Sequence, residues 1–173
     1  PRASGEAFEF DMSTYSALSV IPAIAGIQSA VYELLSRLLS PPDPTHGERV
    51  LHLSFALGRT EFVPDSLRES FRKLTAALAQ TGQNEIEREW QAAFGLTDSG
   101  PLSLCETEYG MAHIFQKTTT LADIGGFYRA FGLERADGAE RPDHLSAEFE
   151  FLSFLAMKES HAFETGKEDL AEI

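Results

Sequence analysis

The chain has a single cysteine, Cys105, and few basic residues. One cysteine excludes an intrachain disulfide and a cysteine-based metal cluster. The 173 residues carry 27 Asp and Glu against 14 Lys and Arg, a formal net charge of −13. A field of that sign repels nucleic acid phosphates and anionic lipid and favours cationic partners. With 43% hydrophobic and 24% charged residues, the composition is that of an ordinary globular domain with a real core.

Long apolar runs are also missing. The longest hydrophobic stretch, residues 17–39, is interrupted by polar or helix-breaking residues, which are Pro22, Gln28, Glu33 and Arg37. Such interruptions are poorly compatible with a membrane span. The first residues hold Glu6, Glu9 and Asp11 where an export signal would have an apolar core. We therefore expect a cytoplasmic protein.

Motifs of the common catalytic sites are absent as well. The sequence contains no Gly-x-Ser-x-Gly elbow, no His-Glu-x-x-His and no glycine-rich nucleotide loop. Cys105 has no partner signature around it and is expected to fill the core. His144 and Glu148 share a helix face at i, i+4 with Asp143 adjacent, but such pairs are common without metal. We predict no catalytic residue, no metal and no cofactor; a small helical enzyme using these three residues around a metal is the alternative.

No run alternates apolar and polar residues at period two, so the sequence predicts an all-α protein. The spacing predicts helices over 24–39 and 46–57, and Pro41-Pro42-Asp43-Pro44 and Gly58 should end them. Three further helices are predicted. The first starts at Asp65 or Ser66 and ends at Gly82, and the second covers 85–94, with Asn84 as its N-cap and Gly95 at its end. The third starts at Thr119 or Thr120 and runs through Phe131. A last helix should start at Asp143 as its cap and run through Leu155. Gly125 and Gly126 are expected to pack closely against a neighbour, since glycine weakens an isolated helix.

These elements predict one helical bundle. Its expected parts are a loose leader over 1–13, a main helical domain over 14–133, a connector loop over 134–142 and a C-terminal helical segment over 143–173 that packs on the bundle.

The segment before the last helix has coherent local chemistry. Pro142 restricts Arg141 to extended geometry and fixes the angle at which the chain enters the helix. Asp143, as a cap, would hold its charge in one place, and His144 can donate or accept near neutral pH. Upstream, the acids Glu106 and Glu108 lie beside Tyr109 in a stretch without clear periodicity. These features fit either a groove for a basic, partly apolar peptide or an ordinary capped helix and a solvated loop.

Read in order, several short motifs resemble the TorD/DmsD/NarJ family of redox-enzyme maturation chaperones over residues 24–160. They are Tyr32-Glu33-Leu34-Leu35-Ser36-Arg37-Leu38, Pro41-Pro42-Asp43, Glu89-Trp90-Gln91-Ala92-Ala93-Phe94, Pro101-Leu102, Glu106-Thr107-Glu108-Tyr109, Leu121-Ala122-Asp123-Ile124-Gly125-Gly126-Phe127-Tyr128-Arg129-Ala130-Phe131-Gly132-Leu133, Arg141-Pro142-Asp143-His144 and Lys158-Glu159. The Gly-Phe-Tyr and Pro-Asp-His pair at this separation is the most specific part of the resemblance.

The resemblance implies an all-helical, non-catalytic cytoplasmic chaperone with the TorD-like fold. Its partner would be the catalytic subunit of a molybdopterin oxidoreductase, bound through its twin-arginine signal peptide or as the apo-enzyme, during cofactor insertion and before export. Carried over by motif, the client-binding residues are Pro142, Asp143 and His144, with Asp143 pairing a signal-peptide arginine. The adjoining groove would be lined by Glu106, Glu108, Tyr109 and Tyr128. A generic helical adaptor that ignores signal peptides is the second alternative.

Relatives of this type usually continue with further helix, so the C-terminal part of this bundle is expected to be shortened. A missing last helix would expose apolar surface on 145–155 and favour a homodimer. No nucleotide motif supports the GTP binding attributed to some relatives.

Overall fold

The structure is a computed structural model that describes residues 17–95, 102–109, 114–136 and 139–167. The leader expected over 1–13 lies outside these residues. Within them the chain is helical, with one isolated antiparallel bridge between Cys105 and His144, so the all-α prediction is confirmed. The elements are α1 (Ala17–Leu39), α2 (Pro44–Leu57), α3 (Asp65–Gln80), α4 (Gln83–Phe94), the short 3₁₀ turn η2 (Glu106–Glu108), α5 (Ile114–Ala130) and α6 (Leu145–Glu164).

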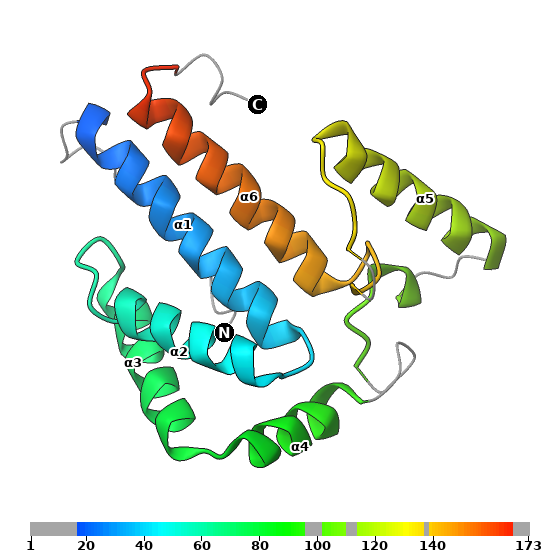
Figure 1. The fold of residues 1–173 in the computed structure, drawn as a ribbon, viewed down its shortest axis with the longest axis horizontal. Helices are drawn as coiled ribbons and strands as arrows, with labels where there is room; N and C mark the ends of the chain where they lie inside the picture. Colours follow the sequence, from blue (N-terminus) through cyan, green and yellow to red (C-terminus); the bar gives the residue numbers. More distant parts are fainter. Residues whose placement is uncertain (1–16, 96–101, 110–113, 137–138, 168–173) are drawn as a thin grey trace, which may run out of the picture.

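The two longest helices, α1 and α6, run antiparallel along most of their length at the centre of the molecule (Figure 1). Small side chains allow this close approach: Ala25 and Ala156 are buried in the described part of each helix. Ser29 Oγ donates to the Ser153 carbonyl at 3.0 Å, and Ser153 Oγ donates back to the Ser29 carbonyl at 2.9 Å. The last helix is therefore joined to the first by packing and by reciprocal hydrogen bonds.

A second layer, α2 with α3, covers the other side of α1. The buried core there is Leu34, Val50, Leu53, Leu57 and Val63, with Phe71, Leu74 and Leu78 of α3 packed against it. Except for Val63, which lies between α2 and α3, these are apolar positions that recur at helical spacing in the sequence, because residues three and four apart share one face of a helix. The core thus lies where α1, α2 and α3 meet.

The ends of α1, α2 and α4 follow the predictions. The C-cap of α3 is Thr81 rather than Gly82, and α6 continues beyond Leu155 to Glu164. The proline run ends α1 at Leu39, and Gly58 and Gly95 are the C-caps of α2 and α4. The N-cap of α3 is Pro64 rather than Asp65 or Ser66, and that of α4 is Gly82 rather than Asn84. In α3 the predicted cap Asp65 instead sits in the first turn, where its carboxylate favours the helix dipole without capping.

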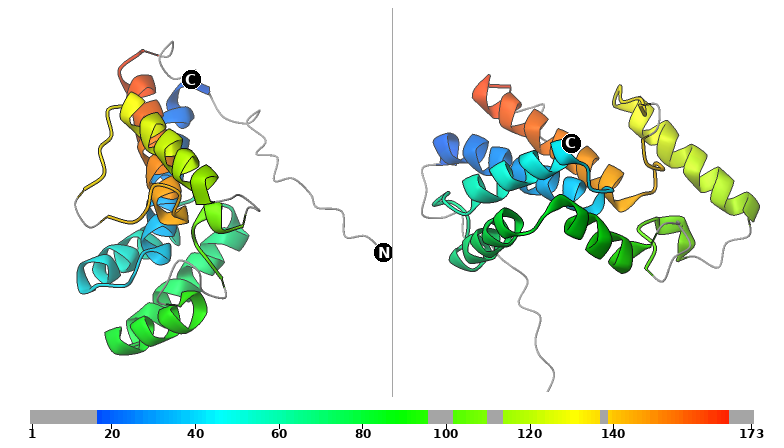
Figure 2. Two further views of the ribbon diagram at one scale, coloured as in Figure 1. Left: turned by 90° about the vertical axis from the view of Figure 1, so that its right-hand side faces the viewer. Right: turned by 60° about the horizontal axis from the view of Figure 1, so that its bottom comes forward.

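Helix α5 stands apart from the α1–α6 pair in Figure 1 and in the right-hand view of Figure 2. It begins at Ile114, so the predicted start at Thr119 or Thr120 is wrong. Its contact with α6 is an aromatic cluster in which Phe127, Tyr128 and Phe131 surround Phe151 at centroid distances of 5.4, 5.0 and 5.1 Å. A Schellman turn ends α5: Gly132 takes φ 76°, and Leu133 N–H donates to the Tyr128 carbonyl at 3.1 Å.

The expected close packing of Gly125 and Gly126 is wrong. A Cβ at either position would meet only the Arg129 guanidinium of the same helix, at 3.8 Å. On α6, Leu152 and Met157 are exposed apolar side chains, and self-association through that surface stays a prediction.

Candidate functional site

A backbone bridge builds the site from segments that are far apart in sequence. Cys105 pairs with His144; Leu145 N–H donates to the Leu104 carbonyl at 2.7 Å, and Glu106 N–H donates to the Asp143 carbonyl at 2.9 Å. Cys105 is buried, as the sequence predicts. The bridge fixes η2 against the first turn of α6, so acids from both segments come together.

Asp143 is not the N-cap of the last helix. The cap is His144, whose Nδ1 accepts from Ser146 N–H at 3.2 Å. Asp143 is instead fully buried, with 0% of its surface exposed. Its Oδ2 accepts from the Thr107 hydroxyl at 2.7 Å and from Thr107 N–H at 3.1 Å. Burial alone would raise the pKa of Asp143, but the hydrogen bonds from Thr107 and Arg141 outweigh it and hold the pKa below its ordinary value.

Arg141 forms a planar fork on that carboxylate. Its Nε donates to Asp143 Oδ1 and its Nη2 to Oδ2, both at 3.0 Å, and Nη1 donates to Glu108 Oε1 at 3.1 Å. Lys117 of α5 reaches the other Glu108 oxygen at 2.8 Å. The hydrogen bonds of Lys117 and then of Arg141 lower the pKa of Glu108, so this carboxyl is firmly ionised near neutral pH.

Two further acids adjoin this ion-pair cluster. Glu106 is exposed and Glu148 half-buried. Within the described part of the chain neither makes an ion pair. Burial, and then the charges of Glu106 and Asp143, raise the pKa of Glu148. Tyr128 lies nearby: its hydroxyl donates to the Pro142 carbonyl at 3.2 Å, and its own pKa is raised by burial and by Glu148.

We call these four acids and two bases the acidic network: Glu106, Glu108, Asp143, Glu148, Arg141 and Lys117. Four carboxylates against two cations leave a surplus of two negative charges. A site with that surplus is suited to a ligand that carries two positive charges. The ion pairs of Arg141 and Lys117 hold the carboxylates of this site in fixed positions.

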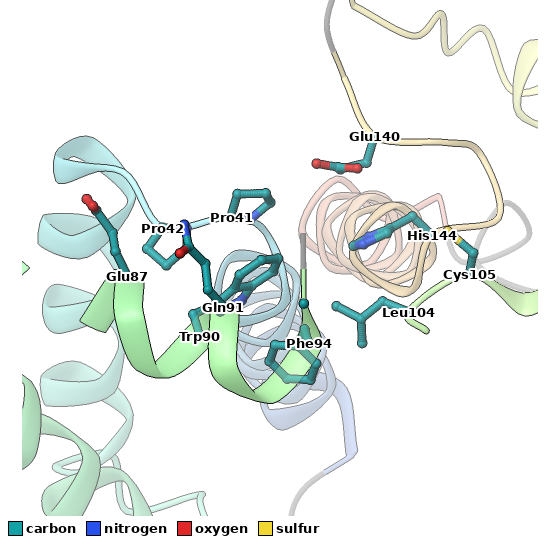
Figure 3. Close-up of a pocket in the computed structure, with 11 residues that line it drawn as sticks. Pro41, Pro42, Glu87, Trp90, Gln91, Phe94, Leu104, Cys105, Glu140 and His144 are labelled. Atoms are coloured by element: carbon teal, nitrogen blue, oxygen red, sulfur yellow. The ribbon is translucent and has the colours of Figure 1, made fainter. Parts of the chain in front are cut away.

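On another side of the same bridge is a pocket of about 420 Å³ (Figure 3). Its walls come from the end of α1, from α4 and from the bridge, and its lining residues are Pro41, Pro42, Glu87, Trp90, Gln91, Phe94, Gly95, Leu104, Cys105, Glu140 and His144. The Trp90 and Phe94 rings lie 5.3 Å apart, and Trp90 Nε1 donates to the Leu38 carbonyl at 3.3 Å. The result is an aromatic, partly apolar pocket with carboxylates of Glu87 and Glu140 among its lining.

The residues predicted for a site divide among three places. Glu106, Glu108 and Asp143 meet in the acidic network, with Pro142 and Tyr128 against it. His144 lines the aromatic pocket. Tyr109 is 66% exposed, and its hydroxyl donates to the Ser103 carbonyl at 2.6 Å.

Sequence reasoning missed Arg141, Thr107 and Lys117 as network members, and it considered Glu148 only for the alternative metal site. Arg141 stood in the quoted motif and was the available signal. For Thr107 no signal existed, because its contact with Asp143 joins residues 36 positions apart.

In the described ranges no three His, Cys, Asp or Glu side chains are grouped so that they could hold a metal ion. None of the helices in those ranges combines the length and apolar character needed to cross a membrane.

Comparison with known proteins gives the family. The model of the nitrate reductase delta subunit family matches residues 61–173. A solved structure from Archaeoglobus fulgidus, of a protein proposed to act in redox enzyme maturation, is similar with a TM-score of 0.50 and 21% identity, over 84% of this chain and 94% of that one. It shows the same helical fold. No curated protein matches the sequence. Since the family model covers more than half of the chain, the protein belongs to the nitrate reductase delta subunit family of NarJ/TorD-type redox-enzyme maturation chaperones.

Proposed function

We propose that this protein is a cytoplasmic, non-catalytic chaperone that binds the catalytic subunit of a molybdopterin oxidoreductase. It holds the subunit, through its twin-arginine signal peptide, during cofactor insertion and before export. Family membership supports the chaperone part of this proposal. The observation that carries the peptide part is the acidic network, whose two surplus negative charges match two adjacent arginines.

The first contact would be made by Glu106 and Glu148. Neither carboxylate is ion-paired among the described residues, and the charge of Glu148 is held at a cost that its raised pKa reports. A guanidinium placed there would remove that cost, because opposite charge within a few ångströms favours the ionised carboxylate. Asp143 is fully buried behind them, so in the free protein its direct partner is Arg141 and not a client arginine.

The aromatic pocket supports the second half of the proposal. A twin-arginine signal carries an apolar segment after its two cations, and such a segment needs a surface that removes it from water. Trp90 and Phe94 offer that surface, and His144 links the pocket to the segment that carries Asp143. Tyr109 and Tyr128 would flank the peptide on the side of the acidic network. The acidic network for the two cations and the aromatic pocket for the apolar segment thus both adjoin the Cys105–His144 bridge.

The test is calorimetric titration of the protein with the Arg-Arg signal peptide of its client and with a Lys-Lys version. We expect saturable binding of the Arg-Arg peptide and weaker binding of the Lys-Lys peptide, because an ammonium cannot form the bidentate fork. The double variant Glu106→Gln/Glu148→Gln should lose at least about tenfold in affinity, a loss of ~1.4 kcal/mol.

A matched control separates the site from the overall charge. Glu150→Gln/Glu164→Gln also removes two negative charges, but from exposed positions of α6, and should change the affinity for the peptide less than about twofold. Equal losses in both double variants would contradict a specific site. If no peptide binds, a pull-down with the cofactor-free subunit tests the chaperone part alone.

A further inference from the structure

The buried carboxylate of Asp143 already holds a guanidinium that belongs to the chain itself. Arg141 contacts it through two parallel N–H···O bonds of 3.0 Å, the bidentate geometry by which arginines are recognised. The same side chain reaches Glu108 at 3.1 Å and the Thr107 hydroxyl at 2.7 Å. Two of the four carboxylates in the acidic network are thus occupied by an internal copy of the group that the proposed ligand would bring.

Solvent reaches Arg141 but not the carboxylate that it covers. Its side chain is 26% exposed, whereas the carboxylate beneath it is wholly buried, so Arg141 covers Asp143 from the solvent side. It sits at the end of the loop after α5, where the described residues 133–136 and 139–140 are mostly exposed. Among the described residues of that loop, the backbone hydrogen bonds run from Leu133 N–H to the Tyr128 carbonyl, from Ala139 N–H to the Ala136 carbonyl and from His144 N–H to the Arg141 carbonyl. The bond to His144 holds the Arg141 backbone beside the first turn of α6, so an exchange requires only that the partly exposed guanidinium rotate toward solvent.

We infer that Arg141 is an internal competitor that closes the peptide site in the free protein and is exchanged for a client arginine on binding. This inference rests on the proposed function and adds its regulation. An empty site would leave Asp143 as an unpaired buried charge, which is strongly unfavourable. The exchange of one guanidinium for another keeps that carboxylate paired throughout, so the bound and free states differ little in electrostatic free energy. The apparent peptide affinity is the intrinsic affinity multiplied by the fraction of molecules in which the site is open, and release of the client is assisted by the returning Arg141.

Arg141→Lys tests the inference without removing a charge. Lysine keeps Asp143 paired but cannot form the fork, so it competes less well than arginine. We expect the variant to bind the Arg-Arg peptide about fivefold to tenfold more tightly than the wild type, the net value of about one hydrogen bond. The matched control is Arg135→Lys, the same substitution in the same loop at a side chain that donates to the Glu140 carbonyl at 3.4 Å. It should leave the affinity unchanged within about twofold.

A second readout uses the unmodified protein. In ¹⁵N-edited NMR spectra, the Arg141 Nε–H of the free protein should be protected from solvent exchange by its bond to Asp143. At saturation with the Arg-Arg peptide it should exchange as fast as the Nε–H of the exposed Arg135.

The outcomes separate this inference from the proposed function. Tighter binding by Arg141→Lys together with loss of Arg141 protection supports the exchange. Equal or weaker binding by the variant, or an Arg141 signal that stays protected at saturation, would overturn it while wild-type peptide binding leaves the proposed function standing. Absence of peptide binding by both the wild type and Arg141→Lys would overturn the inference and the peptide part of the function together.

Discussion

Within the acidic network, Glu148 is placed where its negative charge destabilises the folded protein. Glu148 is half-buried beside Glu106 and Asp143, and none of the described cations is paired with it. Such a group destabilises the folded state when it is ionised, since burial and like charges both disfavour the carboxylate. Residues retained in this condition are common at binding sites, because a ligand of opposite charge relieves the penalty.

The raised pKa of Glu148 gives a prediction with a definite sign. A carboxyl whose folded pKa lies above its unfolded value binds its proton more tightly in the folded state, so stability is lost as pH rises through this interval. Glu148→Gln should therefore raise the midpoint of thermal unfolding at about pH 7 and change it little at about pH 3, below the pKa of the carboxyl in both states. Glu150→Gln, at the exposed neighbouring position, is the control. A lower midpoint for Glu148→Gln at about pH 7 would show that its charge is paired.

At the scale of elements, one junction organises the site: the bridge that joins the segment before η2 to the first turn of α6. His144 takes part twice, since its backbone pairs with Cys105 and its ring caps α6 through Ser146. Cap and bridge act on the same turn, and the loss of either would let the start of α6 fray. Asp143 precedes this turn, so its position and that of Arg141 depend on the cap.

Substitution of His144 separates its capping of α6 from its packing in the pocket. His144→Ala removes the acceptor and should lower the free energy of unfolding by about 1 kcal/mol, as measured by urea denaturation. His144→Asn supplies another good N-cap side chain and should recover most of that loss. Equal destabilisation by both substitutions would mean that the ring acts by packing in the pocket rather than by capping.

The whole molecule adds a long-range field to these local contacts. With a net charge of −13, the chain attracts a cationic peptide from a distance before any contact forms. The aromatic pocket acts only at contact, because burial of apolar surface has no comparable reach. The field should set the rate of association and the pocket the rate of dissociation.

Stopped-flow measurement of peptide binding tests this division. The association rate constant should fall by about tenfold or more between about 0.05 M and about 0.5 M salt, while the dissociation rate constant changes less. Phe94→Ala should do the opposite, with faster dissociation and nearly unchanged association; Phe55→Ala, at an exposed position of α2, is its control. A dissociation rate that follows salt as steeply as association would assign the binding to charge alone.

Most helices were predictable from the sequence because the information for them is local. Apolar spacing marks α1, α2 and α3, and the proline run, Gly58 and Gly95 mark ends where backbone geometry leaves little choice. Helix starts were less predictable: Pro64 and Gly82 take cap positions without a side-chain acceptor, and Thr119 and Thr120, which have the side chain of a capping residue, lie inside α5.

By itself, then, the sequence determined the all-helical class, the ends of α1, α2 and α4, the acidic charge and the motifs that point to the chaperone family. Each of these depends on neighbouring residues or on composition. Only the tertiary structure decided which groups meet. The bridge brings Thr107 into contact with Asp143, 36 residues away. Arg141 binds the Asp143 carboxylate, which the sequence analysis had assigned to a signal-peptide arginine. The bridge also places His144 opposite Trp90 of α4 across the pocket. These contacts depend on the packing of several helices, and no short stretch of sequence carries that information.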